Sequence, residues 1–157
     1  MKHQIKLTIN GDVHELAVEP WQTLLDVLRG DLKYSKTKEG CGVGECSSCT
    51  VSMDRRTVNS CMVLAVDADG REITTIEGLV RENELHPIQK AFVEQGAIQC
   101  GFCTPGMIMS AKALLDRDPG PTDLEIKSAL EGNLCRCTGY VKIVEAVKAS
   151  AKILGAK

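Results

Sequence analysis

Eight cysteines are the residues of this chain whose type and spacing point most directly to chemistry, and they form two unlike sets of four. Within the first set the spacers are four, two and eleven residues long, and within the second they are two, thirty-one and one. Thiolates are soft ligands that bind iron and zinc, and paired thiols also form disulfides. The first set is Cys41, Cys46, Cys49 and Cys61, and the second set is Cys100, Cys103, Cys135 and Cys137.

The spacing of the first set matches the ligand pattern of a plant-type [2Fe–2S] cluster, in which four thiolates hold two irons. Three glycines, Gly40, Gly42 and Gly44, stand around its first cysteine. Glycine permits the backbone conformations that turn N–H groups toward the sulfurs of a cluster. Such N–H···S contacts favour the reduced state and tune its potential. The loop from Glu39 to Cys49 is therefore predicted to wrap around a [2Fe–2S] cluster.

Two other uses of eight cysteines were weighed against this interpretation. Four disulfides would suit a secreted protein, but the N-terminus shows neither the apolar core nor the small-residue cleavage site of a signal peptide. Zinc suits the spacing of Cys100 and Cys103, but structural zinc sites usually close with a second CxxC pair or with spaced histidines. The closing pair here is Cys135 and Cys137, with one residue between them. Two iron–sulfur centres that carry electrons remain the favoured interpretation.

Size and composition agree with this interpretation and exclude other classes. A chain of 157 residues divides into halves of about 80 residues, for which a hydrophobic core alone is marginal and a metal cluster would add stability. Aromatic residues make up 3% of the chain and its net charge is −2, which argues against a nucleic-acid binder. No apolar run reaches the length of a membrane span. We expect a cytoplasmic protein without a membrane segment.

In the first half of the chain, apolar and polar residues alternate as they do in β-strands. Residues 5–9 and 13–18 flank Asn10-Gly11, a dipeptide that favours a type I′ hairpin turn. A helix is predicted to start after Thr23, to run to about Arg29 and to stop near Gly30, and Trp21 beside it is interpreted as a core or interface aromatic. A second hairpin, 50–53 with 57–59, and a final strand, 73–76, complete a predicted β-grasp ferredoxin domain over residues 1–79.

After about residue 79 the hydrophobic period changes from two to about 3.6, which indicates helices. Pro87 and Pro105 suit the first turns of two helices, the second running to about Asp116, and Thr122 with Glu125 forms a capping box for a third. A last helix follows from Tyr140. Residues 80–157 are thus predicted to be a four-helix bundle with the second set on its loops, so that the fold class is α+β.

Two segments carry a resemblance to a known family. Gln-Cys-Gly-Phe-Cys-Thr-Pro-Gly-Met at 99–107 and Gly-Asn-Leu-Cys-Arg-Cys-Thr-Gly-Tyr at 132–140 resemble the small iron–sulfur subunit of the xanthine oxidase family of molybdenum hydroxylases. The likeness spans about residues 4 to 154. One departure is Ser47, where the family usually has glycine, and a modest change of cluster potential is expected from it.

This resemblance implies a function and a set of partners. The first set would hold a [2Fe–2S] cluster that faces a flavin, and the second set would hold a [2Fe–2S] cluster next to molybdopterin, with Gln99 and Cys137 hydrogen-bonded to the pterin. Molybdopterin would belong to a large subunit and FAD to a medium subunit, in a dimer of heterotrimers. No residue of this chain is expected to be catalytic, because the chain would only pass electrons between these cofactors.

Two other roles stay open at this point. A free-standing ferredoxin with two clusters would diffuse between enzymes and elute on gel filtration near its own mass of 17.0 kDa. A [2Fe–2S] redox sensor would change its affinity for a partner with oxidation state. The substrate pocket of the complex would lie in another subunit.

Overall fold

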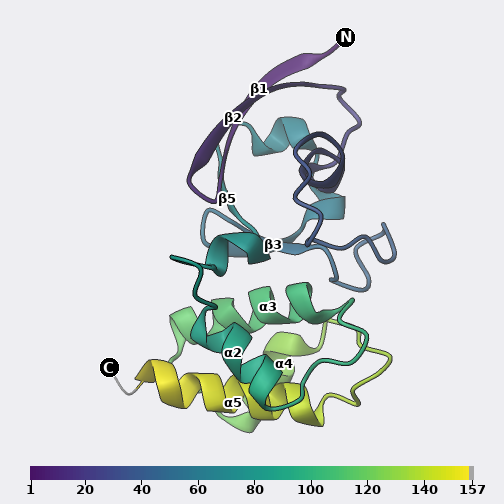
Figure 1. Ribbon diagram of the computed structural model, residues 1–157. Helices are drawn as coiled ribbons and strands as arrows, with labels where there is room; N and C mark the ends of the chain where they lie inside the picture. The colour runs from purple at the N-terminus through teal and green to yellow at the C-terminus, as the bar shows by residue number, and fades with distance from the viewer. Residues whose placement is uncertain (156–157) are drawn as a thin grey trace.

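A computed structural model describes residues 1–155, in which a β-sheet and a group of helices lie end to end (Figure 1). Strand β1 (His3–Ile9) pairs antiparallel with β2 (Asp12–Val18), and the pairing of Ile9 with Asp12 leaves Asn10 and Gly11 as a two-residue turn. Their φ angles are 55° and 96°, both positive as a type I′ turn requires. The predicted hairpin is confirmed, and β2 starts one residue earlier than expected.

The sheet has five strands in the order β2-β1-β5-β3-β4. Strand β3 (Thr50–Met53) pairs antiparallel with β4 (Arg56–Asn59) and with β5 (Glu72–Thr74), while β5 runs parallel to β1. The second predicted hairpin is confirmed, with Asp54 and Arg55 at its turn in the left-handed region. With the helices below, the described chain is a mixed α and β fold.

The first helix differs from its prediction at its C-terminal end. Helix α1 (Leu24–Asp26) begins at the predicted place, with Thr23 as N-cap and a capping box to Asp26. It then widens into a π-helical turn, Val27–Asp31, so the helical segment runs through Gly30 instead of stopping there. The Leu32 N–H donates to the Val27 carbonyl at 3.0 Å, a bond across five residues that opens the turn.

The last strand is also shorter than expected, because β5 ends at Thr74 and not at residue 76. The Thr75 N–H donates to Oδ1 of Asn10 at 2.9 Å, so this amide is satisfied by a side chain in the first hairpin rather than by a strand partner. The chain then turns into a 3₁₀ segment, Ile76–Leu79. A contact between residues 65 positions apart is not visible in a local sequence pattern.

Four longer helices follow and gather below the sheet in Figure 1. Their bounds are α2 (Pro87–Glu94), α3 (Thr104–Arg117), α4 (Asp123–Leu130) and α5 (Val141–Gly155). Prolines lie in the first turns of α2 and α3, and Thr122 and Glu125 form the predicted capping box of α4. Met107 and Met109 are buried, as core-filling methionines would be. Helix α3 packs against β3 and β4 and joins the helices to the sheet.

Two separate hydrophobic cores are present, one around the sheet and one among the helices. Ile76 and Leu79 belong to the predicted first domain, which ends at residue 79, yet they pack in the helical core. The division into domains 1–79 and 80–157 stays a prediction. Trp21 is 70% exposed, so its interpretation as a core aromatic is wrong, because it lies in the turn between β2 and α1. The alternative, that Trp21 meets a partner, remains a prediction.

Candidate metal centres

The first set lies on the long loop before β3 and on the turn after β4. The loop carries Cys41, Cys46 and Cys49, and the 3₁₀ turn Ser60–Met62 returns Cys61 to it. The Cys41 thiol lies beside that of Cys46, and the Cys61 thiol lies beside that of Cys49. Cys49 and Cys61 are buried with Leu25, whereas Cys41 is exposed. The four sulfurs are thus brought together as one outer and one inner pair.

Backbone amides converge on these sulfurs, as predicted for the glycine-rich loop. The Val43 N–H donates to Cys41 Sγ at 3.4 Å, and Gly42 and Gly44 hold φ angles of 68° and 81°. Gly40 has a steric role as well, because a Cβ there would lie 2.7 Å from Cys46 Sγ. The loop needs glycine at these positions for backbone direction and for space.

The acidity of the first set follows from this geometry. The backbone N–H groups of Val43 and Cys46 lower the pKa of Cys41 to about 7. Burial and the nearby Cys49 thiol raise the pKa of Cys61 to about 11. Thiol and thiolate forms of Cys41 are therefore comparably populated near neutral pH, whereas a bound cation would have to displace the proton from Cys61.

The second set lies on two loops at one end of the helices. Cys100 and Cys103 precede α3, and Cys135 and Cys137 lie between α4 and α5. Sγ of Cys137 is 3.6 Å from Sγ of Cys100, and the Cys103 thiol lies beside that of Cys135. Cys100 and Cys137 are exposed, while Cys103 and Cys135 are partly buried. The second set, like the first, consists of two pairs.

Hydrogen bonds from Thr138 distinguish Cys135 from Cys103. Burial raises the pKa of Cys135, but the Thr138 hydroxyl, 3.1 Å from its sulfur, and the Thr138 N–H, at 3.5 Å, outweigh burial and lower this pKa to about 7. Burial and the Cys135 thiol raise the pKa of Cys103 to about 12. Sequence reasoning missed Thr138, although a hydroxyl residue directly after a ligand motif was a visible signal.

The arrangement of each cysteine set as two pairs of thiols indicates which kind of metal centre it would fit. In the part of the chain that the structure describes, no three His, Cys, Asp or Glu side chains converge on a position for a single metal ion. A [2Fe–2S] cluster takes four thiolates, two on each iron, and N–H donors toward its sulfurs. Two pairs of thiols with converging amides have the donor chemistry that such a cluster requires, and both sets provide it.

The surroundings of the second set are apolar and open. Gln99 is exposed beside Cys100, and three large apolar side chains of the same loops are also exposed, namely Ile98, Phe102 and Leu134. The predicted contact of Gln99 and Cys137 with a pterin stays a prediction. What the structure adds is that both residues are accessible to a partner.

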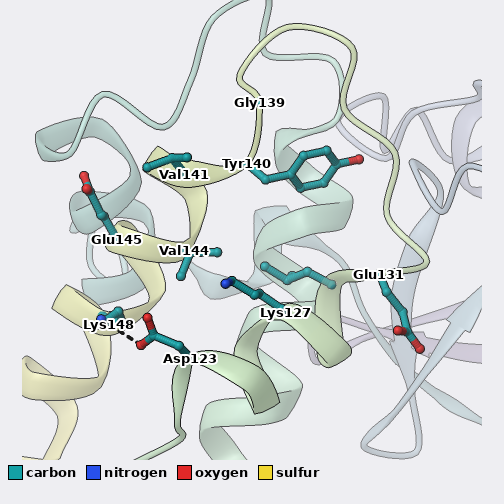
Figure 2. A pocket seen from close by; sticks show the side chains of 10 residues that line it. Asp123, Lys127, Glu131, Gly139, Tyr140, Val141, Val144, Glu145 and Lys148 are labelled. Carbon is teal, nitrogen blue, oxygen red and sulfur yellow. Dashed lines mark ion pairs between the residues drawn. The ribbon is translucent and has the colours of Figure 1, made fainter.

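A surface groove of about 490 Å³ lies between α4 and the start of α5 (Figure 2). Tyr140, Val141 and Val144 form its apolar side, and the ion pair of Lys148 with Asp123, at 2.7 Å, bridges its other end. In Figure 2 the Tyr140 ring points away from Glu145, Lys148 and Asp123. Its hydroxyl instead accepts the Cys135 N–H at 2.8 Å, so this residue belongs to the second set's surroundings.

The fold and the paired thiols define a protein of the 2Fe–2S iron–sulfur class, and two family models agree. Residues 7–79 match a 2Fe-2S iron-sulfur cluster binding domain, and residues 75–148 match a [2Fe-2S] binding domain. The chain is 50% identical to the nicotinate dehydrogenase small FeS subunit of Eubacterium barkeri over 147 residues, which cover 94% of each chain. It belongs to the small iron–sulfur subunits of the xanthine oxidase family.

Solved structures show the same relationship. The chain superposes on a chain of quinoline 2-oxidoreductase from Pseudomonas putida 86 with a TM-score of 0.95 and 41% identity, covering 99% of this chain and 97% of that one. It also matches aldehyde oxidoreductase from Desulfovibrio desulfuricans ATCC 27774, with a TM-score of 0.93 and 42% identity, but covers only 17% of that longer chain. Among residues 1–155, no helix has both the length and the apolar character needed to cross a bilayer.

Proposed function

We propose that this chain is the electron-transfer subunit of a molybdenum hydroxylase, with one [2Fe–2S] cluster held by each cysteine set. The observation that carries the proposal is that both sets, in a member of this family, present two pairs of thiols with N–H or O–H donors aimed at them. When bound, such a cluster accepts and releases one electron at a time. The cysteines of this chain would bind the cluster, and the residues around them would shield it from solvent and donate hydrogen bonds to its sulfurs.

The two sets would face different partners. Cys100 and Cys137 are exposed among apolar side chains, which suits contact with molybdopterin in a large subunit, with Gln99 as a hydrogen-bonding residue. The first set would face the FAD of a medium subunit, and Cys41 is its exposed member. The relatives' names, which describe small subunits, support an assembly of several chains. We propose a dimer of heterotrimers in the cytoplasm, where thiols are kept reduced.

The finer fold assignment belongs to the same proposal. The sheet order, with β1 parallel to β5 and α1 against the sheet's core, supports a β-grasp ferredoxin domain over residues 1–79. The contacts of α2 with α5, of α3 with α4 and of α4 with α5 support a four-helix bundle over residues 80–157. Each domain would then supply one cysteine set.

The test is the metal content and the electron paramagnetic resonance (EPR) spectrum of the purified assembly. We expect four irons and four sulfides per chain and two distinct [2Fe–2S] signals after reduction. Cys46→Ser should remove the first set's signal and slow flavin reduction, and Cys103→Ser should remove the second set's signal. Val13→Ser, on the exposed face of β2, is the control and should leave both signals. Two intact signals in either cysteine variant would disprove the ligand assignment.

Gel filtration of native material addresses the alternative of a diffusible carrier. A subunit elutes with its partner chains as a large complex, whereas a carrier elutes near 17.0 kDa. Stable purification of the iron-loaded chain without partners would favour the carrier.

A further inference from the structure

The two cysteine loops are joined directly by hydrogen bonds across the junction between the sheet and the helices. The Leu134 N–H donates to the Cys46 carbonyl at 3.1 Å. The Asn133 side chain donates through Nδ2 to the Ser47 carbonyl at 3.2 Å. The first of these bonds therefore ends on a first-set cysteine, Cys46. It starts from Leu134, the residue directly before a second-set cysteine, Cys135. We call these two bonds the seam.

The backbone of Asn133 is held by hydrogen bonds at both its N–H and its carbonyl, which positions the side chain for this contact. It is only 4% exposed, and its own N–H donates to the Leu130 carbonyl at the end of α4. Its carbonyl accepts the Tyr140 hydroxyl at 3.0 Å, and that hydroxyl accepts the Cys135 N–H at 2.8 Å. A continuous chain of hydrogen bonds thus runs from Ser47 through Asn133 and Tyr140 to Cys135.

Tyr140 holds an unusual backbone conformation to make these bonds. Its φ angle is 69°, in the left-handed region that disfavours bulky residues. Such a conformation persists only where its surroundings determine it, and here the hydroxyl is held by both Cys135 and Asn133. The position of Tyr140 therefore depends on an ordered second-set loop, and the loop depends on Tyr140.

The opposite side of the seam is equally constrained. The Ser47 carbonyl also accepts the Thr50 hydroxyl at 2.7 Å, which ties it to the start of β3. On α3, a Cβ at Gly106 would lie closer than 3.0 Å to the Ser47 carbonyl oxygen. The first-set loop therefore reaches its partners only because the helix offers a glycine there.

We propose that Asn133 and Tyr140 are positioning residues that couple the two cysteine sets, so that a cluster in one set strengthens the retention of iron in the other. This inference rests on the proposed function, because it requires both sets to hold clusters. A cluster fixes the loop that binds it. Because the Asn133 side chain holds the Ser47 carbonyl beside the bond between Leu134 and Cys46, fixing either loop also places the other, which then loses less freedom when it binds. The coupling is reciprocal by linkage.

The experiment compares iron release from the first set when the second set is loaded and when it is empty. The full chain, in its native assembly or reconstituted, is mixed with a coloured iron chelator, and the decay of the first-set EPR signal gives the rate. Cys103→Ser empties the second set. We expect this emptying to accelerate first-set release by about tenfold, within the usual range of coupling between sites. In an Asn133→Ala background, the same emptying should change the rate less than about twofold.

A matched control is available in Asn59, whose Nδ2 donates to the Gly44 carbonyl at 2.9 Å. This is also an asparagine bonded to a cysteine-loop carbonyl, but both residues lie on the first set's side of the seam. Asn59→Ala should speed release in both loading states and leave their ratio near tenfold. A general loss of stability would therefore be distinguished from a loss of coupling.

Tyr140→Phe provides a second variant that keeps the partly buried ring and removes only the hydroxyl. It should also reduce the ratio, and it serves the same purpose if Asn133→Ala fails to accumulate. An unchanged tenfold ratio in both variants, or a ratio near one in the parent chain, would overturn the coupling. If Cys103→Ser still bound four irons, the ligand assignment itself would fail, which is a different result and would remove the basis of this inference as well.

Discussion

Ser47 shows how a single residue departs from what its backbone position favours. Its φ angle is 51°, in the left-handed region, where glycine has no steric cost and serine does. Its Oγ lies 3.8 Å from where a Cβ on Gly132 would be, so the side chain faces the loop after α4. The earlier expectation that this serine alters the cluster potential stays a prediction. The structure adds a cost in stability.

Ser47→Gly is therefore expected to stabilise the chain. Relief of the left-handed strain, partly offset by the greater freedom of glycine in the unfolded chain, should contribute about 0.5–1 kcal/mol. For a chain of this size the thermal midpoint would rise by roughly 1–4 °C. Arg55→Gly is the control, because Arg55 is exposed at a φ of 67° in the turn between β3 and β4. A lower midpoint for Ser47→Gly than for the parent would show that the serine side chain makes a stabilising contact.

Among the elements, helix α3 has two roles at once. Its first turn follows Cys103, and its face packs on β3 and β4. Gly106 is where these roles meet, since the Ser47 carbonyl occupies the space that a side chain would need. A helix that starts directly after a second-set cysteine is thus shaped by the loop that carries the first set.

Gly106→Ala should separate the helix from the first-set loop. Overpacking of this kind costs about 1–3 kcal/mol, and the thermal midpoint should fall by roughly 2–12 °C. Gly120→Ala is the matched change, because a Cβ there meets nothing within 4 Å and its φ lies outside the left-handed region. It should leave the midpoint nearly unchanged. Equal effects of the two substitutions would show that the close approach at Gly106 is unimportant.

Local signals were sufficient to predict most elements. Each of these signals determines the conformation of residues close to it in the sequence. They are the Asn10-Gly11 turn, the prolines at the starts of α2 and α3, and the capping box at Thr122. The predicted ends of β5 and of the first helix were wrong. The early end of β5 depends on Asn10, and the widened turn after Asp26 has its hydrogen bond across five residues, which the pattern of apolar residues does not indicate.

The same division applies to the site. The cysteine spacing predicted the membership of each set, because ligand motifs are local. It did not predict the bond from Asn133 to Ser47, which joins residues 86 positions apart, or the double use of the Tyr140 hydroxyl. The first of these depends on how the helices dock on the sheet, which no pattern along the chain encodes, and the second on the fold of the loop between α4 and α5.

At the scale of the whole molecule, two modest cores meet at a junction with both cysteine loops at its edge. Metal binding to such loops is linked to folding, because the unfolded chain has no preformed site. Neither core is large, so bound iron should contribute a substantial part of the stability of both.

Removal of iron should therefore lower the thermal midpoint of the whole chain. A ligand present at about a thousand times its dissociation constant stabilises by about 4 kcal/mol, which corresponds to a shift of roughly 8–16 °C here. Calorimetry before and after treatment with a chelator measures the shift. The double variant Cys46→Ser, Cys103→Ser is the control and should not respond to the chelator. An unchanged midpoint in the parent would mean that the loops are ordered without metal.

Trp21 is the only tryptophan of the chain, and its ring already lies largely in water. Its fluorescence emission should therefore change little when the sheet unfolds, which makes it a poor optical reporter of folding. Coverage of this ring by another protein would move the emission to shorter wavelength. The chain thus carries an intrinsic, label-free sensor of subunit docking on the face beside α1.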